Sequence, residues 1–214
     1  EEGADLIIMD DGFQSARLTF DYALLVIDSR RGIGNGHLVP GGPVRAPLDE
    51  QMRQANALLA IGNGNAADAL IRQAARAGKA IHSATLVTVG AEDLAEKVVM
   101  AWSGIADNEK FFRTVTETGA HLYVTRSFPD HHHLSEDEVS EILDHAEGVG
   151  YQLVTTAKDS VRLAGEHGRA EELQEKSRVI EVEIRFDDPK GPDAIIDAAI
   201  VGARRRKLHR LAAK

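Results

Sequence analysis

The sequence predicts an α/β protein in which buried parallel strands alternate with helices. Short apolar runs recur at residues 6–9, 23–27 and 57–61. Runs without an alternating polar face suit strands that are covered on both faces of a parallel sheet. Segments with apolar residues at helical spacing lie between such runs, and the alternation of strands and helices continues through Phe186.

The order of the expected elements follows from apolar runs, helical spacing and glycine or capping residues at their ends. We expect strands at 6–9, 21–28, 57–61, 81–89, 97–102, 121–125 and 152–155. We expect helices at 48–56, 66–77, 108–119, 136–147 and 194–211, with Asn108 capping the third and a Ser135–Glu138 capping box opening the fourth.

Bulk composition excludes several classes of protein. The 214 residues are 43% hydrophobic and 28% charged, which is ordinary for a globular chain, and the net charge of −9 argues against a nucleic-acid partner. The chain has no cysteine, so it has neither disulfides nor thiolate metal sites. No apolar run approaches the ~20 residues of a transmembrane helix. The chain begins abruptly without Met, and we expect it to be part of a longer protein.

The first candidate site is the pair Asp10 and Asp11, which directly follows the apolar run at 6–9 and precedes Gly12. Ligands of parallel sheets bind at the carboxyl ends of strands. Carboxylate oxygens suit Mg²⁺, which usually binds one or two carboxylates together with substrate phosphates. Asp28 ends the next run and competes for this role, although it lacks a carboxylate neighbour and a following glycine.

The segment 30–47 is a second candidate because it is too rich in glycine and proline for a regular helix or central strand. Long loops in compact domains are usually functional or disordered. Fixed prolines and bulky Leu38 and Val39 argue for a binding loop. Its backbone N–H groups, with Arg30, Arg31 and Arg45, suit phosphate or sugar groups.

Asp130-His131-His132-His133 follows an expected strand and precedes a capped helix. An imidazole beside a carboxylate can move protons near neutral pH. A transition-metal site and a polar loop without function are the alternatives, and only His131 and His133 would converge on a metal. Lys158 and Asp159, at a strand–helix turn, either position an anion or cap the helix.

The expected closing helix carries a cluster of basic residues at its carboxyl end. Arg204, Arg205, Arg206, Lys207 and Arg210 are preceded by an apolar stripe that includes Ile196 and Ile200. Cations at that end oppose the helix dipole, which makes a solvated helix end one interpretation. The alternative is contact with anionic lipid head groups, which needs the same segregation of basic and apolar residues.

Several of these stretches occur together, and in this order, in one family. The chain resembles tetraacyldisaccharide 4′-kinase, the kinase of the lipid A pathway of Gram-negative bacteria. The resemblance is carried by Asp10-Asp11-Gly12-Phe13-Gln14, Gly34-Asn35-Gly36, Pro40-Gly41-Gly42-Pro43-Val44-Arg45, Ser103-Gly104-Ile105, Phe111-Phe112, Asp130-His131-His132 and Thr155-Thr156-Ala157-Lys158-Asp159.

The resemblance implies an α/β fold with an incomplete P-loop-kinase-like α/β/α domain at 1–96, a smaller α/β/α domain at 97–186 and a closing amphipathic helix at 187–214. It implies transfer of the γ-phosphoryl of ATP to the 4′-hydroxyl of a lipid A disaccharide precursor at the cytoplasmic face of the inner membrane, with Mg²⁺ as cofactor. The membrane contact would be peripheral, on an anionic surface.

The same resemblance assigns roles to nine residues. Asp10 and Asp11 would be acids near Mg²⁺, and His131 with Asp130 would handle the acceptor hydroxyl. The nucleotide and the lipid would meet Gln14, Asn35, Gly36, Arg45 and Lys158.

Four departures separate this chain from the family pattern. No G-x-x-x-x-G-K-[ST] phosphate-binding loop occurs in it, so we expect the chain to be inactive by itself. Ser15 replaces a usual His, and Ala46 and Ala157 replace usual Glu residues. Two other functions remain open: a metal-dependent hydrolase built on Asp10, Asp11 and 131–133, or a non-catalytic module that binds anionic lipid through 204–210.

Overall fold

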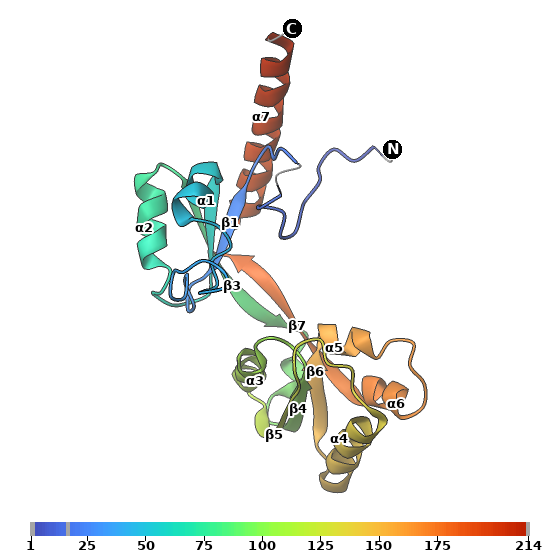
Figure 1. Cartoon of the computed structure of the whole chain (residues 1–214). Helices are drawn as coiled ribbons and strands as arrows, with labels where there is room; N and C mark the ends of the chain where they lie inside the picture. Colours follow the sequence, from blue (N-terminus) through green and yellow to red (C-terminus); the bar gives the residue numbers. More distant parts are fainter. Residues whose placement is uncertain (1–2, 16–17, 213–214) are drawn as a thin grey trace. The chain divides into compact units, whose positions relative to one another are not determined.

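The computed structural model describes residues 3–15 and 18–212 and divides the chain into two compact units. The first unit consists of 1–86 together with 184–214, and the second consists of 87–183. Seven strands follow the order β1-β2-β3-β7-β6-β4-β5 (Figure 1). The chain passes from one unit to the other within β3 (Ala80–Val89) and again within β7 (Ser177–Phe186).

The first unit contains a parallel sheet of β1 (Leu24–Asp28), β2 (Ala57–Ile61) and β3, as the apolar runs predict. Helices α1 (Leu48–Gln54) and α2 (Asp68–Arg76) follow β1 and β2 in the chain. Ile27, Leu58 and Leu70 are buried in one cluster with Met52 of α1. Helix α1, helix α2 and one face of the strands therefore share a hydrophobic core.

The prediction of a strand at 6–9 is wrong, because the structure has no strand there. Ile7 and Ile8 are 80% and 83% exposed, so the run is not buried either. An apolar run becomes a strand only when a neighbouring strand accepts its backbone hydrogen bonds. None of the described strands pairs with this segment.

Helix α7 (Gly191–Ala212) confirms the expected closing helix, and its apolar stripe is only partly buried. Ile196 and Ile200 are each 39% exposed. The helix instead contacts the segment before β1 through Gly202, where a Cβ would lie 2.3 Å from the carbonyl oxygen of Asp21. Arg206 adds an ion pair of 2.7 Å to the Asp21 carboxylate. Gly202 and Arg206 thus join α7 to the segment before β1.

The second unit alternates strands and helices as expected. Its elements are β4 (Val98–Ser103), α3 (Asn108–Glu117), β5 (His121–Ser127), α4 (Glu136–Val149), β6 (Gln152–Thr156), α5 (Ala157–Arg162), α6 (Arg169–Lys176) and β7, after a 3₁₀ turn at Glu92–Leu94. Strands β5, β4, β6 and β7 are parallel neighbours in that order.

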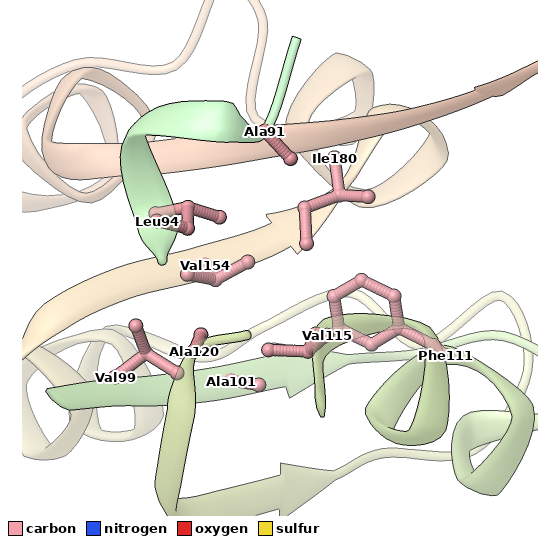
Figure 2. Close-up of a cluster of buried hydrophobic side chains, with 9 residues drawn as sticks. All are labelled: Ala91, Leu94, Val99, Ala101, Phe111, Val115, Ala120, Val154 and Ile180. Atoms are coloured by element: carbon pink, nitrogen blue, oxygen red, sulfur yellow. The ribbon is translucent and has the colours of Figure 1, made fainter. Parts of the chain in front are cut away.

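Alternate residues of β4 belong to two different cores, which makes the second unit a three-layer α/β/α structure. Val99 and Ala101 pack in the cluster that contains Phe111 and Val115 of α3 (Figure 2). Met100 and Trp102 belong to the other cluster, with residues of α4 and α6. Because successive strand side chains point to opposite faces, one strand that is buried from Val99 to Ser103 supports both layers.

Three helices of this unit begin at side-chain caps. Asp107, and not the expected Asn108, caps α3 by accepting a hydrogen bond from the Lys110 amide. The Ser135–Glu138 capping box is confirmed at α4. Thr156 caps α5 by accepting a hydrogen bond from the Asp159 amide at 3.1 Å. The capping box fixes the start of α4, the helix that follows the loop of Asp130 and His131.

Candidate catalytic site

The candidate residues of the first unit lie on loops. Segment 30–47 has no helix or regular strand, as expected, and Asn35 organises it. The Asn35 amide donates to the Gly41 carbonyl at 2.9 Å and accepts from the His37 backbone at 3.1 Å. Gly36 follows with a φ of +73° and donates its N–H to Ile33. Asn35 therefore has a direct role in the shape of the loop.

Asp11 and Arg45 form an ion pair that joins the two candidate stretches of this unit. Arg45 Nη1 lies 2.6 Å from each carboxylate oxygen of Asp11. The hydrogen bond raises the pKa of the Arg45 guanidinium above its ordinary value. Both side chains are more than half exposed, so the pair brings the two loops together without burying charge. Asp10 and Gln14 are also exposed.

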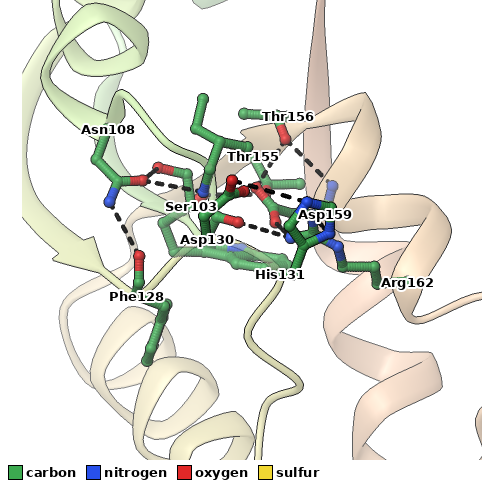
Figure 3. A network of polar contacts seen from close by, with 12 residues as sticks. Ser103, Asn108, Phe128, Asp130, His131, Thr155, Thr156, Asp159 and Arg162 are labelled. Atoms are coloured by element: carbon green, nitrogen blue, oxygen red, sulfur yellow. Dashed lines mark hydrogen bonds and ion pairs between the residues drawn. The ribbon is translucent and has the colours of Figure 1, made fainter. Parts of the chain in front are cut away.

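In the second unit, a polar network surrounds the loop that follows β5 (Figure 3). Asn108 is its first centre: its oxygen accepts from Ser103 Oγ at 2.6 Å, and its amide donates to the Phe128 carbonyl at 3.0 Å. Ser103 is fully buried. The start of α3 is thereby tied both to the end of β4 and to the end of β5, where the Asp130–His131 segment begins.

Asp159 and Arg162 of α5 form the second centre of this network. Asp159 is 3% exposed, and its Oδ1 accepts from Arg162 Nη1 at 2.7 Å. The same Nη1 donates to the Gly104 carbonyl at 2.6 Å. A Cβ on Gly104 would lie 3.2 Å from the Pro129 carbonyl, so a larger residue would crowd this junction. The buried carboxylate thus holds the guanidinium at the turn that carries His131.

His131 and Asp130 are adjacent in space as well as in sequence. His131 Nε2 lies 3.7 Å from Asp130 Oδ2, and His131 Nδ1 lies 3.4 Å from Arg162 Nη2. The φ of His131 is +61°, a conformation that non-glycine residues rarely adopt. The ring is 82% exposed, so it is accessible to a substrate.

The histidines of the run have different surroundings. The His132 ring stacks on Phe128 with centroids 5.3 Å apart, and its Nε2 lies 3.0 Å from Glu138. His132 therefore fixes the loop to α4, whereas His131 faces Arg162. Among residues 3–15 and 18–212, no cluster of three or more His, Cys, Asp or Glu side chains could hold a metal ion.

A cavity of about 370 Å³ adjoins this network. Apolar Trp102, Phe128 and Val139 line it together with Arg162 and Arg169. Lys158 does not line this cavity but is exposed on the first turn of α5.

Comparisons with known proteins decide the family. A model of the family described as tetraacyldisaccharide-1-P 4′-kinase matches residues 1–201. Proteins named tetraacyldisaccharide 4′-kinase from Rhizobium meliloti and Sinorhizobium fredii are each 66% identical to the chain over 207 residues. The chain belongs to the tetraacyldisaccharide-1-P 4′-kinase family. The protein of that name from Sinorhizobium medicae is 63% identical.

The family membership concerns nearly the whole chain but only part of its relatives. Each of these three matches covers 97% of the chain and 60% of the relative, so the chain spans about 60% of the length of the curated kinases. No solved structure matches the chain significantly. No helix of the described residues is long and apolar enough to cross a membrane.

The structure brings together some of the residues that sequence reasoning singled out in this member of the kinase family. It singled out Asp130, His131 and Asp159, but it missed Arg162 and the connecting role of Asn108. Arg162 is 58 residues away from Gly104 and 31 residues away from His131 in the chain. The one local signal is the spacing of Asp159 and Arg162, which places both on one side of a helix.

Proposed function

We propose that the protein to which these residues belong phosphorylates the 4′-hydroxyl of a tetraacyl glucosamine disaccharide 1-phosphate with ATP. The observation that carries this proposal is the match of residues 1–201 to the kinase family, together with relatives of that name at up to 66% identity. Phosphoryl transfer depends mainly on positioning and on stabilisation of charge. The rigidly held loop that carries His131 suits such a task.

We assign the binding of the acceptor hydroxyl to Asp130 and His131. Both side chains are accessible, and their adjacent carboxylate and imidazole can orient a hydroxyl and move its proton. The nucleotide and the sugar would contact Gln14, Asn35, Gly36, Arg45 and Lys158. The two hydrogen bonds of Asn35, at 2.9 and 3.1 Å, support a preformed loop for this contact.

Mg²⁺ would bind at Asp10 and Asp11. Their oxygen donors fit this hard cation, which commonly uses one or two carboxylates, and Asp10 is exposed. Asp11 fits only if it exchanges Arg45 for the ion, because both of its oxygens accept from that guanidinium. When bound, Mg²⁺ would neutralise charge on the phosphates of ATP.

The place of action that we propose is the cytoplasmic face of the inner membrane, with peripheral contact to its anionic surface. The carboxyl end of α7 supports this proposal, since Arg204, Arg205 and Lys207 are exposed beside Leu208, which is 66% exposed. Basic and apolar side chains together favour binding to anionic lipid.

The test is a kinase assay with ATP and the tetraacyldisaccharide 1-phosphate. We expect no product from the 214 residues alone, because they contain no phosphate-binding G-x-x-x-x-G-K-[ST] loop. We expect 4′-phosphorylated product when the segment that the family resemblance places before Asp10 and Asp11, taken from the Rhizobium meliloti kinase, is fused in front of them.

The fused protein with His131→Ala is the variant that tests the site, and His145→Ala, at a half-buried position of α4 outside the polar network, is its matched control. We expect His131→Ala to lower kcat by about 10²-fold or more. A folded fusion protein without kinase activity would refute the proposed function. Full activity of the His131→Ala protein would refute the assigned site.

A further inference from the structure

The contacts of Arg162 set it apart from the other arginines of the second unit. Its side chain is 18% exposed, and its partner Asp159 is 3% exposed. Arg126 and Arg169 instead pair with exposed carboxylates on the surface. A buried carboxylate holds a guanidinium in one orientation, because the carboxylate would be costly to leave unpaired. Arg162 is thus preorganised.

Arg162 contacts the His131 turn at two points. Its Nη1 donates to the Gly104 carbonyl at 2.6 Å, and the His131 backbone N–H donates to the same oxygen at 3.3 Å. Its Nη2 lies 3.4 Å from Nδ1 of the His131 ring. One guanidinium therefore contacts both the carbonyl that anchors the His131 backbone and the ring of His131.

This arrangement determines which ring nitrogen is free to carry a proton. A guanidinium has N–H donors and no acceptor, so Nδ1 of His131 must accept in this contact. The neutral ring then carries its proton on Nε2, which is the nitrogen that lies 3.7 Å from Asp130 Oδ2. Which nitrogen of a histidine is protonated is generally set by the hydrogen bond of the other one.

We propose that Arg162, held by buried Asp159, is a positioning residue that fixes the ring orientation and the Nε2–H tautomer of His131. This inference rests on the proposed kinase function for its catalytic meaning. In the kinase, His131 donates a hydrogen bond from Nε2 toward the reacting oxygens. The Asp130 carboxylate is the hydrogen-bond acceptor of the Asp130–His131 pair.

The test measures the His131 ring by NMR in the ¹⁵N,¹³C-labelled 214-residue chain, with His131→Gln used to assign its signals. In the unsubstituted chain we expect an unprotonated Nδ1, a protonated Nε2 and an ordered ring. In Arg162→Met, which keeps an unbranched side chain but has no donor, we expect more of the Nδ1–H tautomer. We also expect the ring order parameter to fall below about 0.6.

Two variants separate positioning from general damage to the fold. Arg162→Lys retains a donor and should restore part of the tautomer preference. Arg126→Met removes a paired arginine of the same unit and should leave the His131 ring unchanged. If Arg162→Met does not fold, the His131 tautomer in the unsubstituted chain and in Arg162→Lys still tests the proposal. A protonated Nδ1 in the former, or an unchanged ring in every folded Arg162 variant, would overturn the proposal.

The kinetic test uses the fused kinase. We expect Arg162→Met to lower kcat by about 10²-fold, as misplacement of a reacting group commonly does, with little change in KM. Arg162→Lys should recover part of kcat. A rise in KM of the same size, with kcat unchanged, would contradict a positioning role. A fused protein without kinase activity would refute the proposed function while the NMR result for Arg162 stands.

Discussion

Glu138 is the residue whose protonation connects α4 to the candidate loop. Its carboxylate accepts from the Ser135 amide at 2.8 Å and lies 3.0 Å from His132 Nε2. The backbone hydrogen bond from Ser135, and then the hydrogen bond with His132, lower the pKa of Glu138 below its usual 4.5. Both contacts favour the ionised form, so the folded protein binds a proton here less readily than the unfolded chain does.

This lowered pKa predicts how stability depends on pH. The contribution of Glu138 is present above pH 4.5 and is lost as pH falls through the lower pKa of the folded state. We expect Glu138→Gln to flatten the pH dependence of the urea midpoint on the acidic side of pH 4.5. Glu136→Gln, on the same helical turn, is the control that should keep the slope. An unchanged slope in Glu138→Gln would contradict the prediction.

Single residues also show how much of the candidate site the sequence alone could predict. Asp130 and His131 were found because a carboxylate and an imidazole are neighbours in the chain. The Arg162 contacts could not be found in this way, because no local pattern links Gly104 to Arg162 across 58 residues. Asn108 was expected to cap α3, but its neighbour Asp107 does so and frees Asn108 to join two strand ends.

Among the elements, fully buried strands were the easiest to predict from sequence. The expected strand at 57–61 coincides with β2, in which all residues but the last are buried. The run at 6–9 is also entirely apolar but remains exposed and unpaired among the described residues. The composition of a segment determines its preference for strand structure, whereas strand pairing depends on a partner strand elsewhere in the chain.

Helix α7 shows the same distinction for helices. Its length was predicted from spacing, but its contacts depend on Gly202 and Arg206, which meet Asp21 of a distant segment. An apolar stripe predicts burial only when another surface is available to cover it.

The exposed basic end of α7 leads to a prediction for membrane binding. We expect the chain to float with vesicles of phosphatidylglycerol and phosphatidylcholine, and to float much less when Arg204, Arg205 and Lys207 are all changed to Glu. Each basic residue near an anionic surface contributes about 1 kcal/mol. Arg206 is left intact because it holds Asp21.

The matched control reverses the charges of Arg53, Arg72 and Arg76 in α1 and α2, which should leave flotation unchanged. Vesicles of phosphatidylcholine alone should bind neither protein. Flotation that is equal in all variants would rule out this end of α7 as the contact.

At the scale of the whole molecule, the two units differ in how the chain forms them. The second unit is one continuous segment, 87–183, whereas the first needs residues from both ends of the chain. Both clusters that cover the β4 sheet, which include Val99, Phe111, Met100 and Leu143, lie entirely within that segment. A segment with its own complete core satisfies the physical definition of a domain.

We therefore expect the isolated segment 87–183 to fold without the first unit. Trp102, the single tryptophan of the chain, is 2% exposed and reports this by fluorescence. The segment should show blue-shifted emission and one cooperative urea transition. Val115→Asp should abolish the transition, whereas Val149→Asp, at a position that is 59% exposed, should retain it. Red-shifted emission without urea would contradict the prediction.

The first unit is built from two separate segments of the chain, and this has a consequence during synthesis on the ribosome. Translation delivers every residue of 87–183 before residues 184–214, which complete the first unit. Cotranslational folding generally proceeds domain by domain from the amino terminus, but this order is inverted here. The domain encoded by residues 87–183 is ready first, and the nascent residues 3–86 must wait for residues 184–214 to supply α7.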